Sequence, residues 1–475
     1  MEKNKDFYLE FIDTLNELLL LFINRCQHIN QAAIYLQELD FSKVIIDTLW
    51  LDIFFPFRDK YNNRRLSGNS KEVLKRLIWN CNLKPLLPTS TDYSYIETGH
   101  FQETESVIFF KECKGAICFY CYNLRQLYYF LPILEQIREN TIIFYNFDLE
   151  NFSVKNDYIT FVEFQLINEA QCLHQSFLKR NFFDIFQFTN NFLIYLSIFK
   201  PKCIVLLEGC HPEMEALSVI GKQYNIPSIC IQQGWPSVMH SRFRNMNYNY
   251  FLTWGNTFNN LWRKYNPAPK YVSMGYCHKV PEPIKENIIT FFLQAPIIIL
   301  NKEYLEKILE FASWCAESFP CYRVWLREHP EYKIDQDWLN RLSTLPNLEI
   351  KTGEDLGTIL ASTKISVSAF SSTLMESLAY HSIPFVLEFS SAPFYPQNIK
   401  EKKLGYIVGT LEEAKKKMNS VIYNQAIYEE NLRMIFLENQ AYFSDVGDSA
   451  VKNILNFLKK PNYNLQDKLN AISIL

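Results

Sequence analysis

Three consecutive hydroxyl side chains stand between a predicted strand and a predicted helix. Ser371, Ser372 and Thr373 follow an apolar stretch that ends near Ser368, and the helix is expected to begin near Leu374. Backbone N–H groups at a helix start are unpaired and favour an anion, and hydroxyl groups add hydrogen-bond donors. The turn therefore predicts a phosphate site. An ordinary helix N-cap is the alternative, and the two roles do not exclude each other.

A His-Pro pair follows another predicted strand, Tyr322–Leu326. Pro330 would end that strand and leave the His329 imidazole at the sheet edge, where it can donate to a phosphate oxygen. Arg327 or Lys333 could add positive charge there. A solvated surface turn is the alternative. Because the hydroxyl turn is expected after a neighbouring strand, we interpret His329 as a second phosphate-binding group.

An acidic residue follows the apolar stretch Cys203–Leu207. Glu208 and Gly209 come directly after this stretch, and a predicted helix follows them. A carboxylate at this place could take a proton from an acceptor hydroxyl during a transfer reaction. It could equally cap the helix that follows. Three nearby side chains compete with Glu208 for the role of base: His211, Glu213 and Glu215.

Further polar residues are expected at the same cleft. Gln233 and Gly234 end the next strand, where the amide could bind sugar hydroxyls and the glycine could simply permit a tight turn. Glu376 lies early in the helix after the hydroxyl turn, where it could cap that helix or reach a ribose hydroxyl. Asp335 and Asp337 have the D-x-D spacing of metal-dependent transferases, but they precede an amphipathic stretch and are predicted to cap a helix. No metal site is predicted.

These residues lie at the ends of elements in a repeated strand and helix pattern. From Ser106 onward, short apolar runs alternate with helical ones, as in βαβ units. We therefore predict an α/β protein with two Rossmann-like parallel-sheet domains, 101–275 and 276–440. The two domains are expected to face each other across a cleft, and ligands are expected at the carboxyl ends of the strands. The proline-rich segment 266–283 is predicted to link them. Residues 1–100 are expected to form a helical extension, and 441–475 a C-terminal helical segment.

Composition limits the possible functions. The chain has 475 residues, enough for two or three domains, and its net charge of −3 predicts no nucleic-acid partner. The apolar run Leu18–Ile23 is too short to span a membrane and no signal peptide precedes it, so a cytoplasmic protein is expected. The 12 cysteines are scattered as in a reducing compartment, and the pair Cys118 and Cys121 is predicted to pack in the core. No glycine-rich nucleotide loop is present, and no cofactor is predicted.

The region from about Ser106 to Phe457 resembles the GT-B glycosyltransferases of bacterial surface polysaccharides. It is similar in particular to the bacterial sialyltransferase and polysialyltransferase group, and to the capsule polysaccharide and CDP-glycerol transferases. The first group is marked by an acidic pair followed by glycine, a His-Pro, and a Ser-Ser/Thr turn. The corresponding residues here stand in the same order, with Leu207 in place of the first acid: Glu208-Gly209, His329-Pro330 and Ser371-Ser372-Thr373.

The resemblance implies transfer of a sugar from a nucleotide-activated donor to a carbohydrate or glycolipid acceptor, without metal, in capsule or lipopolysaccharide synthesis. By this resemblance Glu208 is the general base, His329 stabilises the leaving phosphate, and Ser371 and Ser372 bind it. The implied donor is a CMP-sugar of the sialic acid or Kdo type, and peripheral association with the inner face of the plasma membrane is compatible with it. The alternatives are a UDP-sugar transferase, an isomerase similar to UDP-N-acetylglucosamine 2-epimerase, and a non-catalytic nucleotide-sugar-binding subunit. Phe370-Ser371, where a glycine pair would be expected, counts against the isomerase.

Overall fold

The computed structural model describes most of residues 114–461 and a few positions between residues 13 and 40. Residues 41–113 and 462–475, with shorter stretches such as 164–187, 235–243, 295–301 and 389–398, are outside the described set. Four residues discussed above as site or motif positions, Gly209, His211, Pro330 and Phe370, also lie outside it.

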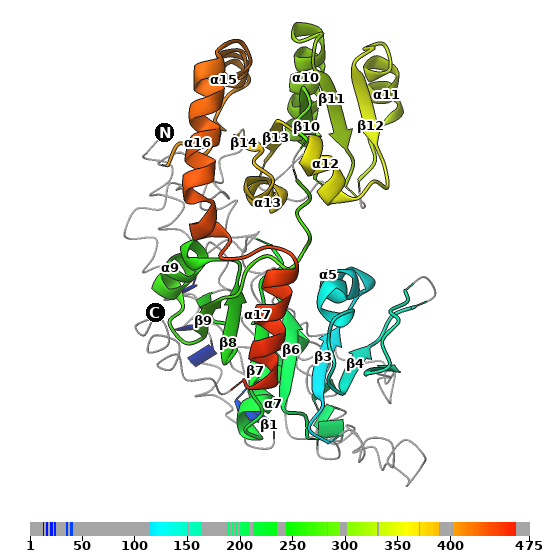
Figure 1. Ribbon diagram of the computed structural model, residues 1–475, viewed down its shortest axis with the longest axis vertical. Helices are drawn as coiled ribbons and strands as arrows, with labels where there is room; N and C mark the ends of the chain where they lie inside the picture. The colour runs from blue at the N-terminus through cyan, green and yellow to red at the C-terminus, as the bar shows by residue number, and fades with distance from the viewer. Residues whose placement is uncertain are drawn as a thin grey trace, which may run out of the picture.

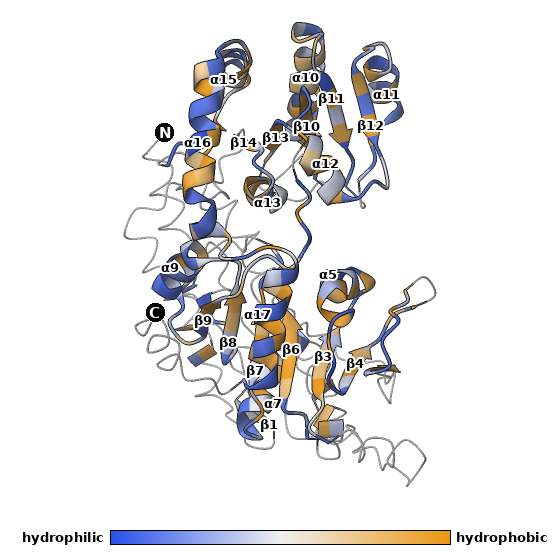
Figure 2. Ribbon diagram, viewed as in Figure 1, coloured by the Kyte–Doolittle hydropathy of each residue, from blue (hydrophilic) through white to orange (hydrophobic). Residues whose placement is uncertain are grey.

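The first domain is built on a seven-stranded parallel sheet with the strand order β5-β4-β3-β6-β7-β8-β9 (Figure 1). Helices α5 (Leu124–Leu134), α7 (Pro212–Gln223) and α9 (Asn256–Tyr265) each connect two successive strands. All residues of β3, β6, β7 and β8 are buried, as expected for central strands covered on both faces. Figure 2 shows the apolar character of β3 and β6. The strands are β3 (Ile117–Cys121), β4 (Thr141–Tyr145), β5 (Ile159–Glu163), β6 (Cys203–Leu207), β7 (Ser228–Ile231), β8 (Tyr250–Thr253) and β9 (Lys270–Ser273).

The second domain has a six-stranded parallel sheet with the order β12-β11-β10-β13-β14-β15. Its helices are α10 (Lys302–Ser318), α11 (Gln336–Leu342), α12 (Leu356–Ser362), α13 (Thr373–Ala379) and α15 (Leu411–Tyr423). The strands are β10 (Ile288–Phe292), β11 (Arg323–Arg327), β12 (Leu348–Lys351), β13 (Ile365–Ser368), β14 (Ile383–Leu387) and β15 (Tyr406–Val408). The prediction of two parallel-sheet α/β domains is confirmed.

The chain crosses between the two domains twice. The first crossing, residues 274–287, leads from β9 to β10. Helix α16 (Gln425–Tyr442) then contacts elements of both domains, and residues 443–447 lead into α17 (Asp448–Lys459), which returns to the first domain (Figure 1). Four apolar side chains of α17 are buried in the hydrophobic core of the first domain. Burial of each such side chain contributes roughly 1.5–3 kcal/mol to the stability of the fold. They are Val451, Ile454, Phe457 and Leu458.

The two crossings are hydrogen-bonded to each other. The Tyr276 backbone N–H donates to the Asp445 carbonyl at 2.9 Å, and the Gly447 N–H donates to the Tyr276 carbonyl at 2.9 Å. Gly275 has φ +98° and approaches Asp445 so closely that a Cβ would overlap its backbone. The position therefore requires glycine.

The structure confirms one prediction about a single segment and corrects two others. The predicted linker 266–283 contains β9, the last strand of the first sheet, so that prediction is wrong at Lys270–Ser273. Asp335 caps α11 as predicted, because its Oδ1 accepts from the Trp338 N–H at 3.0 Å. In the expected helical extension, the positions between 13 and 24 that the structure describes are helical, but β1 (Tyr35–Leu36) and β2 (Leu39–Asp40) form an antiparallel pair that was not predicted.

Candidate functional site

The topology of each sheet marks a place where ligands are expected. In the first sheet the chain builds β4 and β5 to one side of β3 and β6 to β9 to the other, so the order reverses between β3 and β6. In the second sheet it reverses in the same way between β10 and β13. Ligands of open parallel sheets bind outside the carboxyl ends of strands at such reversals. The predicted residues Glu208 and Ser371–Thr373 follow β6 and β13, which border these two points.

Glu208 follows β6 and is buried, with 7% of its surface exposed. Its Oε2 accepts from the backbone N–H groups of Gln233 at 3.1 Å and Gly234 at 3.4 Å. Burial raises the pKa of this carboxyl to about 8, although the two hydrogen bonds lower it. A carboxyl that titrates near neutral pH is suited to accept a proton in a reaction.

The turn that binds Glu208 is held by Gln232, which the sequence analysis did not single out. Its fully buried side chain donates to the Gly234 carbonyl at 2.7 Å and accepts from the Trp254 N–H at 2.8 Å. Its backbone carbonyl accepts from the Tyr129 hydroxyl at 2.6 Å. The turn after β7 therefore has a defined shape that aims two N–H groups at one carboxylate.

The neighbouring Gln233 connects this turn to an arginine that was also missed. With the amide oriented so that each end meets a suitable partner, its nitrogen donates to the Glu208 carbonyl at 3.1 Å and its oxygen accepts from Arg125 Nε at 3.3 Å. Arg125 lies in the first turn of α5, and its side chain is exposed. The only indication in the sequence that Arg125 belongs to the site was its position shortly after β3.

Gly234 brings the two domains into contact. A Cβ at this position would overlap the Ser372 hydroxyl of the second domain. Ser371 Oγ accepts from the Thr373 N–H at 3.2 Å, so Ser371 makes the local bond of a capping residue, whereas the Ser372 side chain does not cap the helix. Because α13 has only seven residues, its dipole is small. The hydroxyl groups are therefore the main donors that this turn can offer an anion.

Arg327 and His329 lie at the carboxyl end of β11. Arg327 is half-buried and its Nη2 donates to the Glu354 carbonyl at 3.2 Å. Burial lowers its pKa, and Asp355 acts in the opposite direction. His329 is half-buried and begins a tight turn, since its carbonyl accepts from the Tyr332 N–H at 3.0 Å. The expectation that His329 and Ser371 follow neighbouring strands is wrong, because β10 lies between β11 and β13.

Glu376 does not cap its helix. It is buried, with 8% exposed, and its Oε1 accepts from the Tyr276 hydroxyl at 2.9 Å. Burial raises its pKa to about 7, whereas the Tyr276 hydrogen bond and the charges of Arg125 and Arg327 lower it. One arginine comes from each domain, so Glu376 lies where the two domains meet.

His278, in the first crossing, is another residue that sequence reasoning missed. Its ring is half-buried between the rings of Tyr129 and Tyr276, with centroid distances of 4.6 and 5.2 Å. Burial lowers its pKa to about 4, and Asp355 opposes this shift. His278 is thus neutral at physiological pH.

The structure separates Glu208 from the other candidate bases that it describes. Glu215 is buried on α7, and its carboxylate accepts from the Asn247 N–H at 3.0 Å rather than from the turn at Gln233 and Gly234. Glu213 is half-buried on the same helix. Glu208, by contrast, accepts hydrogen bonds from the turn at Gln233 and Gly234, which meets the second domain at Ser372.

The described part of the chain contains neither a metal-binding cluster nor a membrane-spanning helix. No group of three His, Cys, Asp or Glu side chains there could hold a metal ion. Cys118 and Cys121 are both buried in β3, and burial raises the pKa of both thiols, as expected for core residues. Among the helices that the structure describes, none combines the length and apolar character needed to cross a bilayer.

Comparisons with known proteins identify the fold. No family model matches the chain, and no curated protein matches it by sequence. The UDP-GlcNAc 2-epimerase from Neisseria meningitidis, solved with UDP-GlcNAc bound, has 13% identity and a TM-score of 0.51, and the match covers 73% of this chain and 100% of that one. The lipopolysaccharide outer core galactosyltransferase WaaB has 12% identity and a TM-score of 0.47, covering 73% and 100%. A variant of the wall teichoic acid polymerase TagF soaked with CDPG has 13% identity and a TM-score of 0.49, covering 76% and 91%.

These similarities concern architecture. The chain has the GT-B arrangement, two parallel-sheet α/β domains joined by a crossing segment, with a C-terminal helix returned to the first domain. The epimerase was solved with UDP-GlcNAc, a uridine nucleotide, so this similarity does not support the CMP-linked donor expected from the motif order.

Proposed function

We propose that this protein transfers a sugar from a nucleotide-activated donor to a hydroxyl group of a carbohydrate acceptor. The single observation that carries this proposal is the approach of Gly234 to Ser372 across the domain junction. Gly234 belongs to the turn that binds the buried carboxyl of Glu208, and Ser372 belongs to the hydroxyl turn of the other domain. A candidate base and a candidate phosphate site thus converge on one place.

In this proposal the Glu208 carboxylate takes the proton of the acceptor hydroxyl, and that oxygen attacks the anomeric carbon of the donor sugar. The bond from this carbon to the phosphate oxygen breaks, and the phosphate leaves with the electron pair. Ser371 and Ser372 donate to the phosphate, while Arg327 and His329 supply donors from the end of β11. No step of this displacement requires a metal ion or a cofactor.

Two further residues support the donor. Glu376 accepts a hydrogen bond from a ribose hydroxyl, and Arg125 adds positive charge from the first domain. What supports this role of Arg125 is that its charge acts on Glu376, where it lowers the pKa, and that Gln233 orients its Nε. Gln233 and Gly234, with the end of β6, form the acceptor side of the site.

We favour a UDP-linked donor. What supports this choice is the fold similarity to an epimerase solved with UDP-GlcNAc. The motif order at Glu208, His329 and Ser371 supports a CMP-linked sugar instead, so cytidine nucleotides belong in the first test.

The test is binding followed by turnover. The full-length protein is titrated by calorimetry with UDP, CMP, CDP and GDP, and the donor sugar of the tightest nucleotide is then incubated with oligosaccharide acceptors. We expect tight binding of one nucleotide and release of that nucleotide only when an acceptor is present. Binding with no release under any condition would favour a non-catalytic binding subunit.

Isomerisation is the second candidate, and the fold similarity to the epimerase favours it. An epimerase needs no acceptor. Incubation with UDP-GlcNAc alone, followed by chromatography of the sugars, separates the two activities because only the isomerase produces an epimer in that sample.

A further inference from the structure

Tyr276 belongs to the first domain crossing but contacts a side chain of the second domain. Its hydroxyl donates to Glu376 Oε1 at 2.9 Å, and both side chains are buried. The partners are 100 positions apart in the sequence. Burial raises the pKa of the Tyr276 hydroxyl well above its ordinary value. The phenol therefore stays protonated and remains a donor at every physiological pH.

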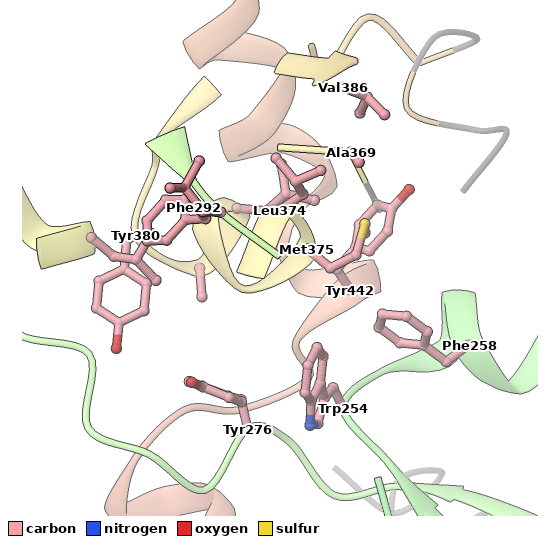
Figure 3. Packing of buried hydrophobic residues seen from close by; sticks show 14 of the residues in the cluster. Trp254, Phe258, Tyr276, Phe292, Ala369, Leu374, Met375, Tyr380, Val386 and Tyr442 are labelled. Carbon is pink, nitrogen blue, oxygen red and sulfur yellow. The ribbon is translucent and has the colours of Figure 1, made fainter. Parts of the chain in front are cut away.

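The backbone and the ring of Tyr276 are both held in place. Its backbone N–H and carbonyl bond to the second crossing, at Asp445 and Gly447. Its ring packs at 5.2 Å from Trp254 in an edge-to-face arrangement and at 5.9 Å from Phe443. Figure 3 shows Tyr276 and Trp254 on the side of the junction opposite Leu374 and Met375 of α13. A hydroxyl on so constrained a ring has one position.

We propose that Tyr276 is a positioning residue that holds the Glu376 carboxylate ready for the nucleoside of the donor. This inference rests on the proposed function, because it takes Glu376 to be the acceptor for a ribose hydroxyl. Tyr276 engages Oε1, and the described residues donate no other hydrogen bond to this carboxylate. Oε2 is then the oxygen that receives the ribose hydroxyl.

The charge state of Glu376 makes this role measurable. A carboxylate accepts a stronger hydrogen bond than a neutral carboxyl. Nucleotide affinity should therefore rise with pH as Glu376 ionises, around its pKa of about 7. The Tyr276 hydrogen bond favours the ionised form, so its loss moves this rise to higher pH. The titratable and charged groups that face Glu376 are Arg125 of α5, Tyr129 of α5, Cys277 of the crossing, Arg327 of β11 and Tyr380 after α13.

The experiment compares three variants of the full-length chain with the wild type. Tyr276→Phe removes only the hydroxyl, and Glu376→Gln removes the charge. Tyr271→Phe is the matched control, because the buried Tyr271 hydroxyl is also a hydrogen-bond donor, to the Asn266 carbonyl at 2.7 Å, but this bond lies within the first domain and does not involve Tyr276 or Glu376. Affinity for UDP and CMP is measured by calorimetry from pH 5.5 to 9 at constant ionic strength.

For Tyr276→Phe we expect a loss of affinity of about tenfold at pH 7, the factor that corresponds to roughly 1.4 kcal/mol. The midpoint of the pH dependence should move upward by about one unit. Glu376→Gln should lack this part of the pH dependence, and Tyr271→Phe should keep the wild-type midpoint.

Each outcome decides the proposal. A Tyr276→Phe curve that superimposes on the wild type, or one that is lowered equally at all pH values, overturns it, since a purely structural bond would produce one of these. A wild type that binds no nucleotide overturns both this inference and the proposed function. Nucleotide binding with the expected shift, but without transfer, refutes the transferase while it supports the role of Tyr276.

Discussion

Glu208→Gln should make the protein inactive and, at alkaline pH, more stable. The amide keeps the shape of the side chain, and its oxygen can still accept from the N–H groups of Gln233 and Gly234, which lie 3.1 and 3.4 Å from Glu208 Oε2. It cannot accept a proton. Loss of a general base typically lowers turnover by about 10²- to 10⁴-fold, so we expect a fall within this range with little change in nucleotide affinity.

The stability change follows from the raised pKa. In the unfolded chain this carboxyl ionises near pH 4.5, but in the folded protein it ionises only near pH 8. The folded state therefore loses stability, relative to acidic conditions, as pH rises from about 4.5 to about 8. Each pKa unit corresponds to roughly 1.4 kcal/mol, so the penalty above pH 8 is on the order of a few kcal/mol. A neutral glutamine does not pass through this transition.

The assay pairs melting temperature with initial rate. At pH 5 the wild type and Glu208→Gln should melt at similar temperatures, and at pH 8.5 the variant should melt higher. The wild-type rate should rise with pH and level off above about 8, because the base acts in its deprotonated form.

Glu215→Gln is the matched control for this prediction. Glu215 is also buried, and burial raises its pKa to about 7, but it bonds to Asn247 and not to the junction. Glu215→Gln should gain stability at alkaline pH and keep its activity. Wild-type transfer by Glu208→Gln, or loss of transfer in Glu215→Gln alone, would refute the assignment of the base.

Four further variants test single contacts. Ser371→Ala with Ser372→Ala should weaken nucleotide binding by ~1–3 kcal/mol, the range for hydrogen bonds to charged groups; calorimetric affinity that stays constant while the melting temperature falls would assign them to capping alone. Gly234→Ala should displace the Ser372 hydroxyl that its Cβ would meet, lowering nucleotide affinity, and a fully wild-type affinity would show that the junction adapts at no cost. Arg125→Met should reduce turnover more than it alters the melting temperature, because the side chain is exposed; unchanged kinetics would remove Arg125 from the site. Asp335→Ala should destabilise the fold by about 1 kcal/mol in denaturant unfolding, because the α11 cap is lost. Transfer should be unaffected, and a loss of transfer would instead assign a catalytic role to the D-x-D pair.

Local patterns in the sequence were enough to predict most elements and the positions of the polar residues between them. The fully buried strand Cys203–Leu207 is a continuous apolar run, and the acidic residue Glu208 marks its end in the sequence. Asp335 could be predicted as a cap because a helix start needs an acceptor within three residues. The alternation of strands and helices was sufficient for two parallel sheets.

Only the tertiary structure decided which of these residues meet. Strand order placed β10 between the strands that carry His329 and Ser371, and no spacing in the chain reveals that order. The return of α17 to the first core and the inclusion of Lys270–Ser273 in the first sheet depend on packing between distant segments. The pairing of Tyr276 with Glu376 spans 100 residues and two domains. The pKa of a buried carboxyl depends on the water that folding removes from it and on the charges that folding brings near it. The residue type alone therefore could not predict the raised pKa values of Glu208 and Glu376.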